Sequence, residues 1–413
     1  MAGMGIGTGI FSFVTFLVLV RQSPERSLFR GLLRTPFAYA SLLFFLLAAL
    51  SLLVAALDPP LTGALPGFKE LAKFHYFLVP FWVALAFLAN SRGQDMESEK
   101  FFRFLAYAAL FNSVLAAVQF FARDLLPDSW LDARFFRGVG SPGAAERFHA
   151  QGIMMFHLSF ASCMSFVAAL GLARLFFPLA NDSLKQKIFW TLVGLGGALA
   201  TFYSFSRIAW VAILVIPILL AFLKKPKWGL LSVLVAGVLA VSIWFGSEMT
   251  RKRWEYSING IHERQQMWAA AVEMAKDRPV LGVGFGRSGH YSEPYATRAL
   301  GYKPEFTSHA HNNFLDMLAA MGWLGLGVFL FWWTCIFAMA WSSFRQAPTD
   351  RRWLPAAAMA GFVAFHINGL TQVNFWDGKS QHTLMLWVGL TLALWMRDRL
   401  GPVEKGQILR CNH

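Results

Sequence analysis

The stretch TSHAHNNFLDMLAAMGWLGLGVFLFWW occupies residues 307–333 and joins two kinds of sequence. Two histidines and two asparagines stand within the five residues from His309 to Asn313. After Asp316 the chain is apolar for long enough to cross the hydrocarbon core of a bilayer, which takes about 20 residues of helix. The stretch therefore predicts a transmembrane helix whose first turn carries reactive side chains at the membrane surface.

The composition predicts the same class of protein for the whole chain. Of 413 residues, 56% are hydrophobic and only 15% are charged, whereas about 25% of residues are charged in soluble domains. We therefore expect an all-α polytopic membrane protein. The net charge of +14 fits basic loops and anionic lipid-linked partners, and we expect no nucleic acid as a partner. The odd set of three cysteines suits neither a disulfide framework nor a metal site.

Uncharged apolar stretches predict about eleven spans, or twelve, within a single integral membrane domain over residues 1–413. The expected spans are 4–20, 36–57, 72–90, 104–122, 150–173, 188–206, 208–223, 228–246, 317–342, 354–376 and 381–396. Short basic loops orient them, because such loops stay on the cytoplasmic side. These loops contain Arg21, Arg26, Arg30 and Arg34, then Lys224, Lys225 and Lys227, then Arg345, Arg351 and Arg352.

This orientation leaves two longer segments outside, at about 123–149 and at 247–311. We expect the second, between spans eight and nine, to contain short helices and part of an active site. Both segments are rich in arginine, including Arg137 and Arg147 in the first. The arginines either contact lipid headgroups or bind an anionic substrate at the outer leaflet.

Within the second segment, residues 261–280 have the pattern of a helix that ends at Pro279. Its apolar stripe at three-to-four spacing consists of Ile261, Trp268, Val272 and Ala275. Arg264 and Trp268 are four residues apart and so share a face. Arg264 is either a solvated edge residue or a ligand for an anion.

The next residues, 281–294, contain Gly284, Gly286 and Gly289 in a GxGxxG arrangement. No βαβ pattern surrounds them, so a dinucleotide-binding fold is not expected. The glycines predict either a tight turn or a close backbone approach to a phosphate or a sugar. Arg287 stands beside them.

In the stretch HAHNN, Asn312 or Asn313 is suited to cap a helix, and Asp316 falls in its first turn. The partial positive charge at a helix N-terminus favours a phosphate oxygen and disfavours an imidazolium, which would keep His311 neutral and able to accept a proton. In an extended lead-in, the rings of His309 and His311 would differ in direction. Zinc is an alternative, but HxH supplies only two ligands, and a purely structural cap is another.

One arginine lies far from other charged residues. Arg207 in SFSRIAW (204–210) falls between spans six and seven, and the nearest charged residues are Lys187 and Lys224. A charge in such surroundings is costly and indicates function, although a side chain that reaches the headgroups would look the same.

Taken in order, Arg207 in SFSRIAW, Arg264 with Trp268, DRPVLGVGFG (277–286) and the HAHNN helix resemble the O-antigen ligase and polymerase family of bacterial inner-membrane glycosyltransferases. The resemblance covers about 190–340. It implies that a glycan leaves undecaprenyl diphosphate at the periplasmic face. Ligases pass it to a sugar of the lipid A core, and polymerases pass it to another lipid-linked repeat unit. The family's catalytic residues correspond to Arg207, Arg264 and His311.

The chemistry of these side chains fits such a reaction. Arginine forks stabilise a departing diphosphate bidentately, and His311 is suited to deprotonate the acceptor hydroxyl. Direct attack inverts the anomeric centre, and without a DxD pair we expect no metal and no cofactor. Further substrate contacts are expected from His309, Arg287, Asn312, Arg147 and Arg137.

Two other classes of protein remain open. A transporter or flippase would use polar groups near the middle of the bilayer, and the available ones are His157, Arg174, His366, Asn368 and Asn374. A non-catalytic assembly protein of a polysaccharide pathway would need no base beside its arginines.

Overall fold

The computed structural model describes residues 26–59, 67–90, 99–122, 125–126, 149–154, 156–246, 248, 258–304 and 307–399. Over these ranges the chain forms helices and no strand, so the predicted all-α class is confirmed. The expected first span at 4–20, and Arg137 and Arg147, lie outside the described residues.

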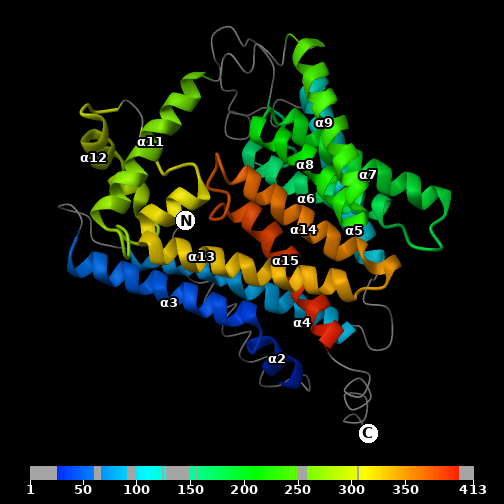
Figure 1. Cartoon of the computed structure of the whole chain (residues 1–413), viewed down its shortest axis with the longest axis horizontal. Helices are drawn as coiled ribbons and strands as arrows, with labels where there is room; N and C mark the ends of the chain where they lie inside the picture. Colours follow the sequence, from blue (N-terminus) through cyan, green and yellow to red (C-terminus); the bar gives the residue numbers. More distant parts are fainter. Residues whose placement is uncertain are drawn as a thin grey trace.

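The helices follow the predicted spans closely (Figure 1). The order is α2 (Arg26–Leu33), α3 (Pro36–Leu57), the 3-10 helix η1 (Phe68–Leu78), α4 (Val79–Asn90), α5 (Glu99–Phe121), α6 (His157–Phe176), α7 (Leu184–Tyr203), α8 (Arg207–Lys224), α9 (Pro226–Gly246), α11 (Ile258–Asp277), α12 (Ser288–Leu300), α13 (Asn313–Gln346), η4 (Thr349–Arg351), α14 (Trp353–Asn368) and α15 (Gly378–Arg399).

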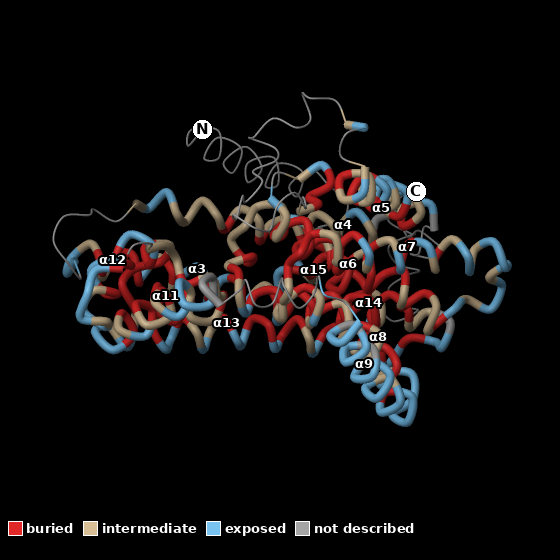
Figure 2. The backbone as a smooth tube through the Cα atoms, turned by 90° about the horizontal axis from the view of Figure 1, so that it is seen from above, coloured by how far each residue is buried: buried red, intermediate tan, exposed pale blue. Residues whose placement is uncertain are grey.

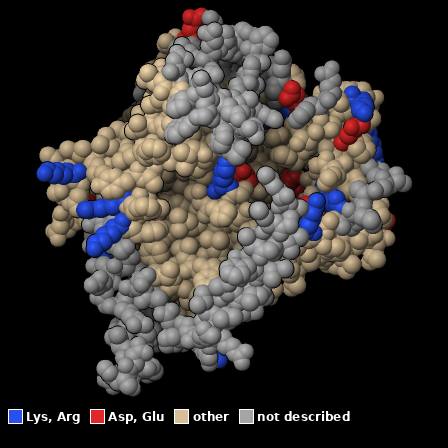
Figure 3. All heavy atoms as spheres, turned by 180° about the vertical axis from the view of Figure 1, so that it is seen from behind, with Lys and Arg blue, Asp and Glu red and all other residues tan. Residues whose placement is uncertain are grey.

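Seven helical segments of the described chain are long and apolar enough to cross a membrane. They are Pro36–Leu57, Phe68–Leu88, Lys100–Phe121, His157–Phe176, Arg207–Lys224, Pro226–Gly246 and Asn313–Gln346. Helix α14 is apolar but has only 16 residues, and α7 and α15 carry lysine or arginine near their ends. Broad uncharged areas separate the charged side chains on the face shown in Figure 3, as expected where a surface meets hydrocarbon.

Helix α13 runs beside α3 across the molecule and contacts α14 and α15 on its other side (Figure 1). Its buried rings, such as Trp332 and Phe329, belong to the main core that Figure 2 shows in red. Helices α11 and α12 lie apart from the bundle and share a small core of their own with the start of α13. The start of α13 therefore stands at the junction of the two cores.

A break in α13 binds the segment before α12. Gly322 has φ 66° and ψ −165°, which interrupts the helix. The N–H groups of Val283 and Gly284 donate to the carbonyls of Ala319 and Ala320, each at 3.0 Å, and Trp323 N–H donates to Pro279 O at 2.8 Å. The backbone groups freed by the break thus find partners in another segment.

The glycines at 282–286 are explained by this docking. Gly282 has φ 65°, and a Cβ added there would lie 2.4 Å from the carbonyl carbon of Ala320. A tight turn against a helix was one of two uses that the sequence left open, and these contacts account for it. The contact fixes residues 279–286 directly before α12 and beside α13.

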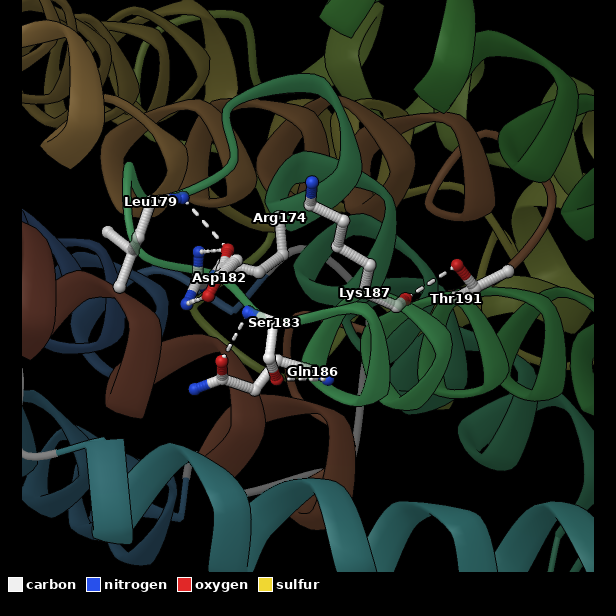
Figure 4. A network of polar contacts seen from close by, with 7 residues as sticks. All are labelled: Arg174, Leu179, Asp182, Ser183, Gln186, Lys187 and Thr191. Atoms are coloured by element: carbon white, nitrogen blue, oxygen red, sulfur yellow. Dashed lines mark hydrogen bonds and ion pairs between the residues drawn. The ribbon is translucent and has the colours of Figure 1, made fainter.

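Arg174 has a structural role at the connection between α6 and α7 (Figure 4). Its two terminal nitrogens donate to the carboxylate of Asp182 at 2.5 and 2.8 Å, and both side chains are almost fully buried. Asp182 also accepts from the backbone N–H of Leu179 at 2.9 Å. Arg174 lies 5.2 Å from the ring of Trp353. Its charge is therefore neutralised within the fold.

Candidate active site

The N-terminus of α13 is capped as predicted. The Asn312 side-chain oxygen accepts from Phe314 N–H at 2.9 Å and from Leu315 N–H at 3.1 Å, and Asp316 lies in the first turn. The Asn312 amide nitrogen donates to Leu370 O at 3.0 Å. The cap therefore also ties α13 to the connection between α14 and α15.

Asn313 strengthens the same tie from inside the fold. Its backbone N–H donates to Gly369 O at 2.8 Å, and its side-chain amide donates to Asn374 Oδ1 at 2.6 Å. Asn374 in turn donates to Ser162 Oγ at 3.2 Å, and Asn368 donates to Ser165 Oγ at 3.3 Å. The asparagines considered for a transport pathway thus have structural partners.

His311 adopts a left-handed backbone conformation with φ 46°. The rings of His309 and His311 lie 4.3 Å apart between centroids, with 37° between their planes. The expectation that the two rings point in different directions is therefore wrong. It assumed an extended lead-in, and the left-handed residue breaks the alternation of an extended chain.

Helix α11 holds the histidine segment in place. The Trp268 indole N–H donates to Ala310 O at 2.8 Å, between the two histidines. Arg264, one turn earlier on α11, is half-buried. Helix α11 thus presents a hydrogen-bond donor and a cation to the same segment.

The predicted apolar stripe of this helix is partly wrong. Ile261 and Val272 are exposed, by 38% and 40%. The face that packs against α12 and α13 includes Ala270, Ala271 and Met274, with Trp268 beside them. Because MWAAAVEMA (267–275) has apolar residues on both faces of the helix, the sequence pattern fits burial of either face.

The electrostatics join Arg264 to His311. Burial first, and then the nearby charges of His309 and Arg264, lower the pKa of His311 from 6.5 to about 4. Burial also lowers the pKa of Arg264 from its usual value, and Glu263 opposes this. His311 is therefore neutral near pH 7, as predicted, although burial and not the helix dipole is the first cause. Its Nδ1 is buried without a hydrogen-bond partner in the described part of the chain.

Arg287 lies close by, at the start of α12. It is the N-cap residue of this helix and is only 7% exposed, and its Nε and Nη2 have no hydrogen-bond partner within the described residues. The next residue, Ser288, donates to Asp316 Oδ1 at 2.6 Å, and Gly289 faces the backbone of His309. Two donors of a buried guanidinium are thus available near the histidines.

The sequence pattern predicted a turn over residues 281–294, which include the first half of α12. Gly284, Gly286 and Gly289 favoured that interpretation, yet Ser288–Leu300 is helical, even with Pro294 inside it. Tyr291, Tyr295 and Ala296 are buried in the core that α12 shares with α11. Packing against α11 thus overrides the weak helix propensity of these residues.

A further pair of charged residues, not predicted from the sequence, lies on η1. Lys73 Nζ lies 2.7 Å from Glu70 Oε2 and 6.0 Å from the ring of Trp376. A Cβ on Gly286 would lie 2.9 Å from Glu70 Oε2, so η1 passes directly beside the start of α12. Three charged residues at the start of the expected span 72–90, Lys69, Glu70 and Lys73 in FKELAKFHYFL (68–78), were the available signal.

Arg207 is half-buried and is the first residue of α8. Phe205, just before it, has φ 54°, so the chain turns sharply between α7 and α8. Helix α8 packs against α14, whose last turn leads to the residues that bind the start of α13. The convergence of Arg207 with Arg264 and His311 stays a prediction.

The comparison with protein families gives one match, to the family described as O-Antigen ligase, over residues 191–330. Residues 191–330 are thus similar to the O-antigen ligase family. The matched segment runs from α7 into α13 and includes Arg207, Arg264, Arg287 and His309 to Asn312. No curated protein matches the chain. The match confirms the resemblance to O-antigen ligases and supports a membrane protein of the glycosyltransferase type.

Proposed function

We propose that the chain is an O-antigen ligase-type glycosyltransferase of the bacterial inner membrane. It transfers a glycan from undecaprenyl diphosphate to a sugar hydroxyl of the lipid A core at the periplasmic face, with inversion and without a metal. The observation that supports this best is the neutral, half-buried His311 beside the Arg264 cation, at a capped helix N-terminus within the matched segment.

The low pKa of His311 is consistent with a site whose anionic substrate has not yet bound. A base with a pKa of about 4 is weak at neutral pH. A diphosphate bound at Arg264 would offset the positive charge that lowers this pKa and would favour the imidazolium. His311 thus becomes a better base once the donor is in place, and its strength is linked to substrate binding.

Each predicted site residue then has a role. His311 removes the proton from the acceptor hydroxyl, and Arg207 and Arg264 stabilise the departing diphosphate. Arg287 and His309 contact the substrates, as do Arg137 and Arg147. Both polar atoms of the Asn312 amide are engaged in the cap, so Asn312 acts by holding His311 in position.

A polymerase that joins lipid-linked repeat units is the second candidate, because the family match supports either reaction type. A transporter is less favoured, since Arg174, Asn368 and Asn374 are engaged in hydrogen bonds of the fold. The ligase and the polymerase share a donor and differ only in the acceptor.

The test uses the purified full-length chain in lipid nanodiscs with a glycan on undecaprenyl diphosphate. Lipid A core is the acceptor in one reaction and a second lipid-linked repeat unit in the other. Product masses then distinguish ligase from polymerase, and EDTA in a parallel reaction should leave the rate unchanged. Donor uptake into vesicles without glycan transfer would instead indicate a transporter.

A further inference from the structure

A second feature of the molecule is an apolar groove between α3 and η1, outside the residues assigned above. Its volume is about 790 Å³, and it opens on a side of α3 where Tyr39, Leu42 and Phe45 are exposed. Its lining includes Leu33, Leu42 and Phe45 on one wall and Ala72, His75 and Leu78 on the other. Ser41 and His75, two polar residues of this lining, already have hydrogen bonds with the protein. The groove is therefore suited to hydrocarbon.

The 3-10 geometry of η1 explains why one side of it is apolar. With 3.0 residues per turn, side chains three apart eclipse and form straight rows along the axis. One row holds Leu71, Phe74 and Phe77, and the next holds Ala72, His75 and Leu78; both rows line the groove. The third row holds Glu70, Lys73 and Tyr76, and none of these lines the groove.

The third row faces the candidate active site. Glu70 lies against Gly286, immediately before Arg287. Lys73 and His309 both interact electrostatically with Asp316 in the first turn of α13. The groove and the histidine segment thus lie on different sides of a single helix, and a lipid in the groove would have its polar end beside Lys73.

We propose that this groove binds the prenyl chain of the lipid-linked donor, with the diphosphate passing over η1 toward Lys73 and Arg287. The inference rests on the proposed function, because it takes the donor to be a polyprenyl diphosphate. A prenyl chain cannot enter water without a large free-energy penalty, and a groove open to the bilayer admits it sideways. The cations across η1 select a lipid with a diphosphate over one with a single phosphate.

The kinetic test narrows the groove with Leu42→Trp. Leu42 is 56% exposed, so the fold should tolerate a larger side chain. Leu53→Trp is the matched control, because Leu53 is on the same helix, is 47% exposed and does not line the groove. Each variant is assayed with the same glycan on undecaprenyl diphosphate and on a short, water-soluble prenyl diphosphate.

Leu42→Trp should raise KM for the long-chain donor about tenfold, the effect of displacing roughly two methylene groups of the prenyl chain from apolar contact. The same variant should leave KM for the short-chain donor and both kcat values unchanged, and Leu53→Trp should change neither KM. Equal effects of the two variants, or equal effects on the two donors, would overturn the assignment.

A binding test needs no turnover and so separates this inference from the proposed function. Undecaprenyl diphosphate with a diazirine in its prenyl chain is photolysed with the full chain in nanodiscs, and the labelled peptides are identified. Labels in 38–45 and 71–78 that are competed by undecaprenyl diphosphate, and not by phosphatidylglycerol, support the groove. They would do so even if no glycan were transferred. Labels elsewhere, or equal competition by phosphatidylglycerol, would overturn it.

Discussion

His311 is held in position by hydrogen bonds of the residues on both sides of it and by its own backbone conformation. Its role as a base depends on that placement. Trp268 binds the preceding carbonyl, Asn312 binds the connection after α14, and the left-handed φ of His311 turns its ring toward His309. We predict that His311→Ala lowers kcat about 10²–10⁴-fold, the usual contribution of a positioned general base. The variant should insert and fold normally, as judged by its melting curve in detergent.

His309→Ala is the natural comparison, because the ring of His309 lies beside that of His311, with 4.3 Å between their centroids. We expect a smaller loss of kcat for this variant than for His311→Ala. If His311→Ala kept near-normal turnover while His309→Ala did not, the assignment of the base would pass to His309.

The pKa of His311 predicts how the rate depends on pH. A base works when neutral, so kcat/KM, which reports the free enzyme, should fall only as the pH approaches about 4. Donor binding adds negative charge and raises this pKa, so the acid limb of kcat should lie at higher pH than the acid limb of kcat/KM. Arg264→Gln removes a positive neighbour and should move the kcat/KM limb upward. Coincident limbs in the wild-type protein would contradict the link between donor and base.

The helix cap was predictable from the sequence, because capping depends only on residues next to one another in the chain. A cap needs only an asparagine before the first helical N–H groups, so Asn312 and Asp316 were found. The sign of φ at His311 depends on contacts from α11 and from the connection after α14, which lie far away in the sequence. The contact between the two histidine rings therefore could not be predicted.

At the scale of elements, α13 and the segment 279–286 form one unit. A Cβ on Gly322 would lie 2.5 Å from Pro279 O, in a conformation that side chains rarely adopt. We predict that Gly322→Ala lowers the free energy of unfolding by about 2–4 kcal/mol and reduces activity with it, because the start of α12 is displaced. Gly327→Ala on the same helix, where nothing lies within 4 Å of an added Cβ, should be neutral. Equal melting temperatures for the two variants would contradict a structural role of the break.

Hydropathy alone placed the spans of the bundle, because each span must satisfy its backbone within lipid. Some ends differ: α6 begins at His157 and α14 ends at Asn368, against the predicted 150–173 and 354–376. The predicted range 36–57 coincides with α3. Helix α12 and the charged row of η1 were missed, since their positions depend on packing against α11 and α13. By hydropathy, the second half of η1 was assigned to the expected span 72–90. Lys73 was therefore not predicted as a site residue.

Arg207 is linked to the histidine segment through the packing of the whole bundle. Its helix, α8, packs against α14, and α14 leads into the connection that binds the cap of α13. We predict that Arg207, Arg264 and His311 lie within about 10 Å of one diphosphate, since each must reach the same small group. Arg207→Lys should then weaken donor binding almost as much as Arg207→Ala, because an ammonium cannot replace a bidentate guanidinium.

A double-mutant cycle measures this convergence. Donor binding is compared in Arg207→Ala, Arg264→Ala and the double variant, in nanodiscs and with undecaprenyl diphosphate as ligand. Two arginines on one diphosphate should give effects that are not additive, with an interaction energy of about 0.5–3 kcal/mol, whereas distant residues give additive ones. Full activity in both Arg207 variants, together with additive binding effects, would make Arg207 a headgroup anchor. The diphosphate would then be held by Arg264 together with Arg287, which has donors without a partner in the described part of the chain, and Lys73, which interacts electrostatically with Asp316 as His309 does.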